Sequence, residues 1–266
     1  SHTVFEMATG GCLDTLSAAF AGFRHLGGTE HVTTDLGRQQ ALAFTDLTNA
    51  RCFGDTRDHE SWLPLVGEPD YVKAGQPCTD YASLGKGLGR FGNKGGDLFL
   101  LQVEILLTLN PKVLRLEMVP NALNVNDGYE VKWVIDQLSS RYHIHADLVP
   151  VWQYGDPSAR SRLFIIGLRS DVFNHDDWSW PDHMCDESFY PIARDIAIPD
   201  GKVPINYWRH DRPHTYANTR PPKPCAIQHI GYGGDPSKPK SAGYSNSPND
   251  IQGWDGMLAT QMGTNG

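Results

Sequence analysis

Apolar residues follow two alternating spacings along the first 169 residues of the chain. Short continuous apolar runs indicate β-strands, and apolar residues three to four apart indicate helices. The strand-like runs lie at residues 3–7, 31–34, 71–74, 113–116, 146–151 and 163–168, and the helical spacing at residues 13–23, 97–110 and 131–140. Strands that alternate with helices are typical of an α/β fold. We therefore predict a doubly wound, mostly parallel sheet with helices for residues 3–169.

The pattern changes at about residue 170. Regular periodicity fades, proline and glycine become more frequent, and aromatic residues are interspersed with polar ones up to residue 266. We predict a smaller, irregular region there, beside the α/β core. A chain of 266 residues is long enough for this division. It shows no transmembrane segment and no signal peptide, and we expect no membrane partner.

The most informative stretch runs from Gly75 to Gly96 and reads GQPCTDYASLGKGLGRFGNKGG. Its seven glycines let the backbone approach a ligand closely. Cys78 follows Pro77 in this loop, just past a predicted strand, which is a suitable place for a nucleophile. The alternative is that Cys78 is a small buried hydrophobic residue.

The beginning of the chain has features of a nucleotide-binding unit. The strand at residues 3–7 leads through Ala8, Thr9, Gly10 and Gly11 into a helix, whose N-terminus offers free N–H groups. Asp35 directly follows the next predicted strand and lies about 25 residues after the glycine turn, where doubly wound folds place an acid for ribose hydroxyls. Asp35 could also begin a helix. Asp55, after Gly54, is at another predicted strand end, although Gly-Asp alone indicates only a turn.

Charged residues accompany two later strands. Glu117 directly follows the apolar run 113–116, so it should reach the same edge of the sheet as Cys78. Arg160 and Arg162 lie two residues apart as the chain enters the strand at 163–168, so they should point to the same side. Such a pair suits an anionic or carbonyl partner.

This order of motifs resembles the cytosine-C5 methyltransferases of DNA, which use S-adenosylmethionine. GQPCTDYASLGKG matches the family's Gly-x-Pro-Cys-Gln-x-Phe-Ser followed by Gly-Lys, VLRLEMVPNAL matches its Glu-Asn-Val, and GDPSARSRLFIIG matches its Pro-Gln-x-Arg-x-Arg. The resemblance covers residues 4–169. It implies a Rossmann-like methyltransferase core over residues 3–169, and over 170–266 a target-recognition-like region with the start of an incomplete C-terminal return.

The resemblance also implies a reaction and a set of site residues. Cys78 would add to C6 of a cytosine flipped out of double-stranded DNA, Glu117 would hydrogen-bond N3 and the amine, and Arg162 with Arg160 would stabilise charge near O2. The methyl donor, S-adenosylmethionine, would leave as S-adenosylhomocysteine. The implied cofactor-binding residues are Met7, Ala8, Thr9, Gly10, Gly11, Asp35, Asp55, Gly75 and Pro77.

Several positions depart from the family motifs. Where the family has Phe-x-Gly-x-Gly-Gly, this chain has Glu6 in place of the aromatic residue and Ala8 in place of the first glycine. Thr79, Ala82, Met118 and Ser158 replace further supporting residues. The departures leave open a catalytically silent relative that binds nucleic acid or acts as a scaffold. The core motifs do not separate a DNA from an RNA cytosine-5 methyltransferase, and a dinucleotide-binding oxidoreductase is the weaker remaining alternative.

Charge and cysteine usage add two expectations. The net charge of −8 excludes a basic coat over the whole protein, but residues 191–241 carry eight bases and four acids, which fits either phosphate contacts or a solvated surface. Five cysteines without a CxxC pair indicate a reducing compartment. We expect an intracellular protein, in the nucleus of a eukaryote or in the cytoplasm or nucleoid if it is bacterial or viral.

The end of the chain does not show how the C-terminal part of the family's fold would be completed. The family has a further cofactor-binding strand and helix after the recognition region, and residues 251–266 look like the approach to them. These elements are removed by truncation, supplied by a second chain or absent. The histidines and cysteines between residues 183 and 229 match no familiar zinc spacing, so we predict no metal site.

Overall fold

The computed structural model describes residues 1–75, 80–81, 88–92, 95–156, 160–184, 229–231 and 251–252. The chain divides into two units, Ser1–Leu148 with Arg162–Trp180, and Val149–Ser161 with Pro181–Gly266. The first unit carries most of the described elements.

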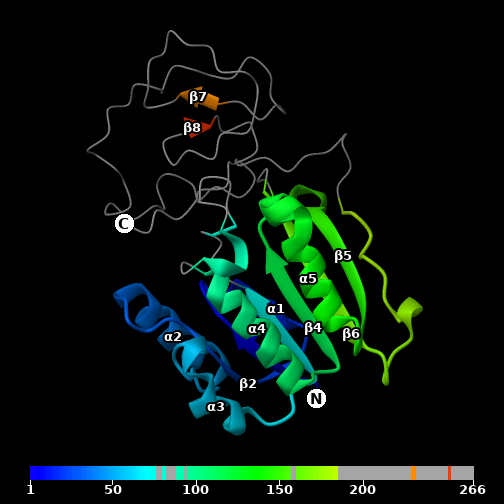
Figure 1. Cartoon of the computed structure of the whole chain (residues 1–266). Helices are drawn as coiled ribbons and strands as arrows, with labels where there is room; N and C mark the ends of the chain where they lie inside the picture. Colours follow the sequence, from blue (N-terminus) through cyan, green and yellow to red (C-terminus); the bar gives the residue numbers. More distant parts are fainter. Residues whose placement is uncertain are drawn as a thin grey trace. The chain divides into compact units, whose positions relative to one another are not determined.

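A six-stranded sheet forms the centre of the first unit (Figure 1). Its strands, in the spatial order β2-β1-β3-β4-β6-β5, are β1 (Thr3–Met7), β2 (Arg24–Gly28), β3 (Tyr71–Gly75), β4 (Val113–Met118), β5 (Tyr142–Pro150) and β6 (Ser161–Arg169). The pairs β1–β2, β1–β3 and β3–β4 are parallel, whereas β4 and β6 are antiparallel. The predicted α/β class and mostly parallel sheet are confirmed.

Among the described residues, five α-helices and six short 3-10 helices connect the strands. The α-helices are α1 (Leu13–Phe20), α2 (Asp35–Thr48), α3 (His59–Val66), α4 (Gly96–Leu109) and α5 (Tyr129–Leu138). The 3-10 helices are η1 (Thr56–Asp58), η2 (Gly89–Phe91), η3 (Pro120–Leu123), η4 (Val125–Gly128), η5 (Val151–Tyr154) and η6 (His175–Asp177). None of the described helices is long and apolar enough to cross a membrane.

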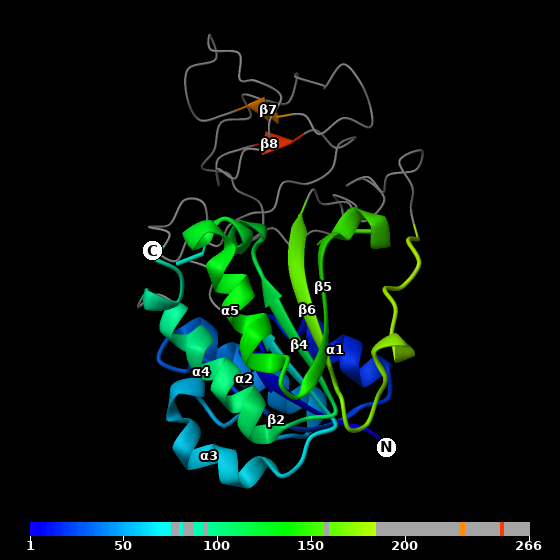
Figure 2. The ribbon, with the colours of Figure 1, turned by 45° about the vertical axis from the view of Figure 1, so that its right-hand side comes forward.

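The two faces of the sheet differ in polarity. Alternate strand residues, such as Phe5, Val72 and Leu114, join side chains of α3, α4 and α5 in one apolar cluster. The residues between them point to the opposite face, which α1 covers (Figure 2). Glu6 and Lys73 are buried on that second face, so its centre is charged rather than apolar.

The predicted strand at residues 31–34 is wrong. The second strand is β2, which lies earlier in the chain and ends in Gly27 and Gly28. A Cβ atom at Gly27 would come within 2.4 Å of the Phe53 ring, and one at Gly28 within 2.7 Å of Thr9. Close packing therefore requires glycine here, and the strand lacks the apolar pattern by which we located the others.

Other boundaries differ by a few residues. The first helix ends at Phe20, because Gly22 takes a positive φ of 81° that turns the chain toward β2. The strand predicted at residues 146–151 begins earlier, at Tyr142. In the second unit, β7 (His229–Gly231) pairs antiparallel with β8 (Ile251–Gln252).

Candidate functional site

The turn between β1 and α1 has an unusual backbone. Ala8, Gly10 and Cys12 all have left-handed φ angles, of 58°, 54° and 60°. Two bonds hold this turn to the end of β2: the Ala8 N–H donates to Thr29 Oγ1 at 3.2 Å, and the Thr9 N–H donates to the Thr29 carbonyl at 3.0 Å. The predicted glycine turn, from Met7 to Gly11, thus lies at the carboxyl edge of the sheet.

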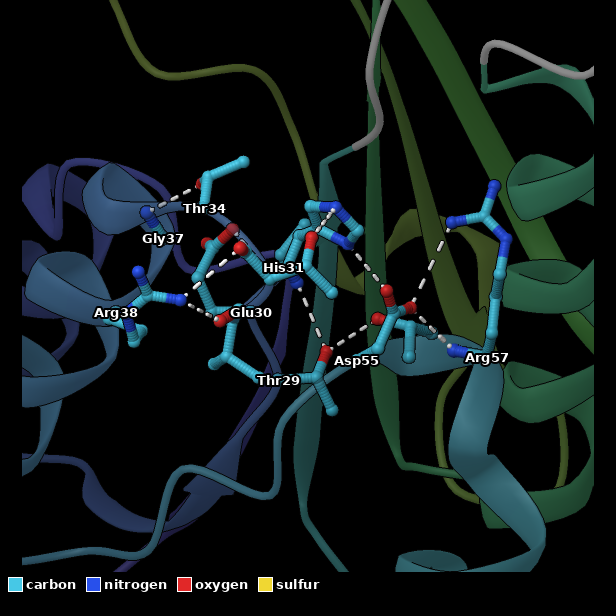
Figure 3. Close-up of polar contacts among 12 residues, drawn as sticks. Thr29, Glu30, His31, Thr34, Gly37, Arg38, Asp55 and Arg57 are labelled. Atoms are coloured by element: carbon cyan, nitrogen blue, oxygen red, sulfur yellow. Dashed lines mark hydrogen bonds and ion pairs between the residues drawn. The ribbon is translucent and has the colours of Figure 1, made fainter.

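Glu30 supplies the carboxylate that faces this turn. Its Oε2 accepts from the Gly10 N–H at 2.6 Å and from the Thr9 hydroxyl at 3.3 Å, while its Oε1 accepts from the His31 N–H at 2.8 Å. Figure 3 shows Glu30 between Thr29 and His31, just beyond β2. A carboxylate at this position of a doubly wound sheet is suited to ribose hydroxyls.

The predicted placement of Asp35 at a strand end is wrong. Asp35 is the first residue of α2, its side chain is 91% exposed, and it pairs with Arg38. The Thr34 hydroxyl caps this helix by accepting from the Gly37 N–H at 3.0 Å. Helix initiation explains the acid at this position, and Glu30 is the acid that follows the strand.

Asp55 lies beside the same edge and is held by two elements. It caps η1 by accepting from the Arg57 N–H at 2.9 Å, and its Oδ2 lies 2.6 Å from His31 Nδ1. Burial alone would raise the pKa of Asp55, but these hydrogen bonds and the charge of Arg57 hold that pKa below its usual value. The other imidazole nitrogen of His31 lies 2.6 Å from the Thr33 hydroxyl. The His31 ring is therefore fixed through both nitrogens.

The end of β3, which leads into the Pro77-Cys78 loop, lies beside the end of β4. Gly75, the last residue of β3, is paired in register with Glu117 of β4. The Gly75 carbonyl accepts from Gln102 Nε2 of α4 at 3.1 Å. Pro77 and Cys78 themselves lie outside the described residues.

Beyond the cysteine, the same loop is anchored at its described ends. The Asp80 carboxylate is buried and accepts from the Gly96 N–H at 3.1 Å, at the start of α4. The Gly89 N–H donates to the Asp80 carbonyl at 3.2 Å. A Cβ atom at Gly92 would come within 2.1 Å of the Asp80 carboxyl carbon, so this position requires glycine.

Glu117 and Arg162 meet at the β4–β6 junction. Arg162 Nε donates to Glu117 Oε1 at 3.0 Å, and both side chains are mostly buried. The antiparallel register, which opposes Glu117 to Phe164, brings the two side chains to one face. Arg160 precedes β6 in the second unit, where its carbonyl accepts from the Val151 N–H at 3.0 Å.

The sequence motifs did not predict three residues at the carboxyl edge of the sheet, namely Thr29, Glu30 and His31. The visible signal was the sequence Gly27-Gly28-Thr29-Glu30, in which two glycines end a short strand and an acid follows. The arrangement places the turn after β1 and the Glu30 and Asp55 carboxylates at one edge of the sheet, and the Glu117–Arg162 pair at the end of β4. Carboxylates can accept hydrogen bonds from the hydroxyls of a nucleoside. An acid–guanidinium pair can protonate or polarise a heterocyclic base.

Known proteins resemble this chain in sequence. The family model for C-5 cytosine-specific DNA methylases matches residues 18–215. The type II methyltransferase M.BbvI of Brevibacillus brevis is 35% identical over 166 residues, covering 60% of this chain and 44% of that protein. M.HaeII of Haemophilus aegyptius is 30% identical over 161 residues, covering 60% and 47%. The chain thus spans about half the length of the curated relatives it matches.

Two solved structures share the fold. One is a protein assigned as a prophage-encoded DNA modification methyltransferase of E. coli, with a TM-score of 0.57 and 19% identity over 75% of this chain and 56% of that one. The other is a DNMT2 mutant of Spodoptera frugiperda, with a TM-score of 0.52 and 17% identity over 75% and 60%. At these identities the likeness concerns the fold.

Proposed function

Because the chain belongs to the C-5 cytosine-specific DNA methylase family, we propose that it transfers a methyl group from S-adenosylmethionine to C5 of a cytosine in double-stranded DNA. The observation that carries this proposal is the Glu117–Arg162 pair, 3.0 Å apart, beside Gly75 at the start of the Pro77-Cys78 loop. An acid and a guanidinium at one strand edge can serve the two polar sides of a pyrimidine ring.

The proposed chemistry begins with nucleophilic addition. The Cys78 thiolate forms a bond to C6, and the ring's electrons move to make C5 nucleophilic. Glu117 hydrogen-bonds N3 and the exocyclic amine, and Arg162, with Arg160 in support, stabilises charge at O2. The bound donor supplies the methyl group. Loss of the C5 proton to a base and departure of the thiolate then restore the aromatic ring.

The glycine turn is the proposed cofactor site. Met7, Ala8, Thr9, Gly10 and Gly11 line the end of β1, and the positive φ angles of Ala8 and Gly10 let the backbone approach a nucleoside closely. The carboxylates of Glu30 and Asp55 lie at the same edge and suit hydroxyl and amine groups. Gly75 and Pro77 complete the proposed set, and Glu30 takes the role that the sequence pattern gave to Asp35.

The proposed partner is DNA, with residues 170–250 as its recognition region. Eight bases in residues 191–241 favour phosphate contacts there. Flipping the target base costs on the order of a few kcal/mol, which these contacts would offset. We further propose an intracellular location.

A covalent trap tests the reaction. Incubation with S-adenosylmethionine and a DNA duplex containing 5-fluorocytosine should yield a protein–DNA adduct, because fluorine prevents the final elimination. The adduct should be absent in Cys78→Ser and present in the control Cys185→Ser. Denaturing gel electrophoresis resolves the adduct from free protein.

The trap also separates the alternatives. An adduct that forms only on a 5-fluorocytosine RNA would assign an RNA methyltransferase. DNA binding without any adduct, in protein that binds S-adenosylmethionine, would assign a catalytically silent relative. Either result would overturn the proposed reaction.

A further inference from the structure

A buried ion pair joins the two central strands at the residues that precede the candidate site. Glu6 of β1 and Lys73 of β3 are paired in register, and Lys73 Nζ lies 2.8 Å from Glu6 Oε2. The two side chains are 0% and 5% exposed. Burying both charges is costly unless each is well bonded. The other hydrogen-bond partners of Glu6 and Lys73 therefore determine whether both groups can remain charged.

Every oxygen of the Glu6 carboxylate is bonded. Oε1 lies 2.9 Å from His25 Nε2 of β2, and Oε2 accepts from the Thr15 hydroxyl of α1 at 2.7 Å as well as from Lys73. Burial alone would raise the pKa of Glu6, but the hydrogen bonds from His25 and Lys73 hold that pKa below its usual value. The carboxylate is therefore charged at neutral pH.

The network continues to a fourth strand. Lys73 Nζ also lies 3.3 Å from Asp14 Oδ2 of α1, and Asp14 pairs with Arg115 of β4. Arg115 is the register partner of Lys73, and its guanidinium lies 5.5 Å from the Phe164 ring centre of β6. One polar network therefore spans β2, β1, β3, β4 and α1.

The position of the pair along its strands suggests its role. Glu6 is two residues before Ala8, where the glycine turn begins, and Lys73 is two residues before Gly75, where the Pro77-Cys78 loop begins. The pair also bonds to the first turn of α1, the helix that the glycine turn leads into. A shift of β1 against β3 would move the two ligand-bearing segments relative to each other.

From this geometry we propose that Glu6 and Lys73 are positioning residues that hold the glycine turn in register with the Pro77-Cys78 loop, and thus the methyl donor in register with the cysteine. The inference deepens the proposed function and depends on it for the identity of the two ligands. Neither side chain touches either ligand in this proposal. The pair acts through the strands.

Stability alone does not require this ion pair. Buried pairs can often be replaced by neutral residues of similar shape without loss of stability, whereas removal of one partner is damaging. The double variant Glu6→Gln/Lys73→Met keeps the shape, leaves the amide oxygen as an acceptor for the Thr15 hydroxyl, and lets the amide N–H donate to His25 Nε2 in the tautomer that accepts there. It is therefore the decisive variant, while Lys73→Met alone leaves the buried Glu6 carboxylate without its lysine partner.

The chain offers a matched control at the other end of the same strands. Asp70, just before β3, lies 2.6 Å from Lys112, just before β4, and accepts from the Thr3 N–H of β1 at 2.8 Å. This pair also joins neighbouring strands, but it lies away from both ligand-bearing segments. Asp70→Asn/Lys112→Met should therefore leave their register unchanged.

The experiment measures two quantities on the whole chain. Amide hydrogen exchange of the ligand-free protein should be at least tenfold faster at Thr9 and Gly10 in Glu6→Gln/Lys73→Met than in wild type, and unchanged in the control. With DNA and S-adenosylmethionine, the double variant should lose about 10- to 100-fold in the rate of methyl transfer with unchanged DNA affinity, since misplaced reactants cost rate rather than binding.

Each outcome has one meaning. Exchange within twofold of wild type in the double variant, or an equal acceleration in the control, would overturn the positioning role. A wild-type protein that neither binds S-adenosylmethionine nor transfers methyl groups would refute the proposed function instead, and the exchange comparison would still decide whether the pair orders the turn.

Discussion

Ala8 occupies a backbone conformation that suits glycine. Its φ of 58° lies in the left-handed region, which costs a residue with a Cβ atom about 1 kcal/mol. We expect Ala8→Gly to raise the free energy of unfolding by up to about 1 kcal/mol, less the entropy that glycine adds to the unfolded chain. Urea denaturation measures this difference.

The control for this substitution is Ala21→Gly. Ala21 directly follows α1 and has an ordinary φ of −75°, so glycine brings no relief of strain there and should not stabilise the protein. A destabilised Ala8→Gly variant would show that the Ala8 methyl group contributes more by packing than it costs in backbone strain.

Glu30 and Asp35 provide a paired test of the proposed cofactor site. Glu30→Gln removes the charge that faces the Gly10 N–H and should weaken S-adenosylmethionine binding about tenfold, the effect of losing one charged hydrogen bond. Asp35→Asn changes an exposed helix residue and should leave the affinity unchanged. Calorimetric titration distinguishes them. The reverse ranking would return the ribose-binding role to Asp35.

At the scale of elements, one acid ties the amino ends of three neighbouring strands. The hydrogen bond from Lys112, with those from Thr3, lowers the pKa of Asp70 to about 2. Because the folded pKa lies below the unfolded value of about 4, the ionised carboxylate stabilises the protein above pH 4. This contribution is lost as the pH falls from about 4 to about 2.

We therefore expect Asp70→Asn to lower the free energy of unfolding by about 1 kcal/mol at pH 7, a value reduced for the solvent exposure of Lys112, and to make no difference near pH 2. Urea unfolding of both proteins across this range measures the change. Asp136→Asn on α5, which breaks an exposed pair with Lys132, should have no measurable effect at either pH. A pH-independent deficit for Asp70→Asn would contradict the linkage.

At the scale of the whole molecule, the local sequence pattern was sufficient to predict strands that are apolar. It was insufficient to predict the strand β2, which is not. The apolar runs of β4 and β6 located Glu117 and Arg162 in advance. The strand β2 escaped prediction because its glycines are dictated by the Phe53 and Phe44 rings, which come from later segments. The position of Glu30 at a strand end was missed for the same reason, because its only signal is two glycines followed by an acid.

The buried network was equally invisible to a reading of single segments. Glu6, Lys73 and Arg115 each interrupt an apolar strand, which is a signal that sequence alone contains. Their mutual partnership depends on strand order and register, which no local pattern specifies. The positions of loop residues and the partners of charged strand residues therefore became known only from the three-dimensional fold.

The antiparallel junction between β4 and β6 has a consequence for how such a protein can diversify. Glu117 and Arg162 are joined across two hydrogen-bonded strands, and 44 residues of chain separate them in sequence. Insertions, deletions or wholesale exchange of the intervening connections would leave their separation unchanged. The chain between β4 and β6 can accordingly vary in length from lineage to lineage while the acid–guanidinium pair stays in place.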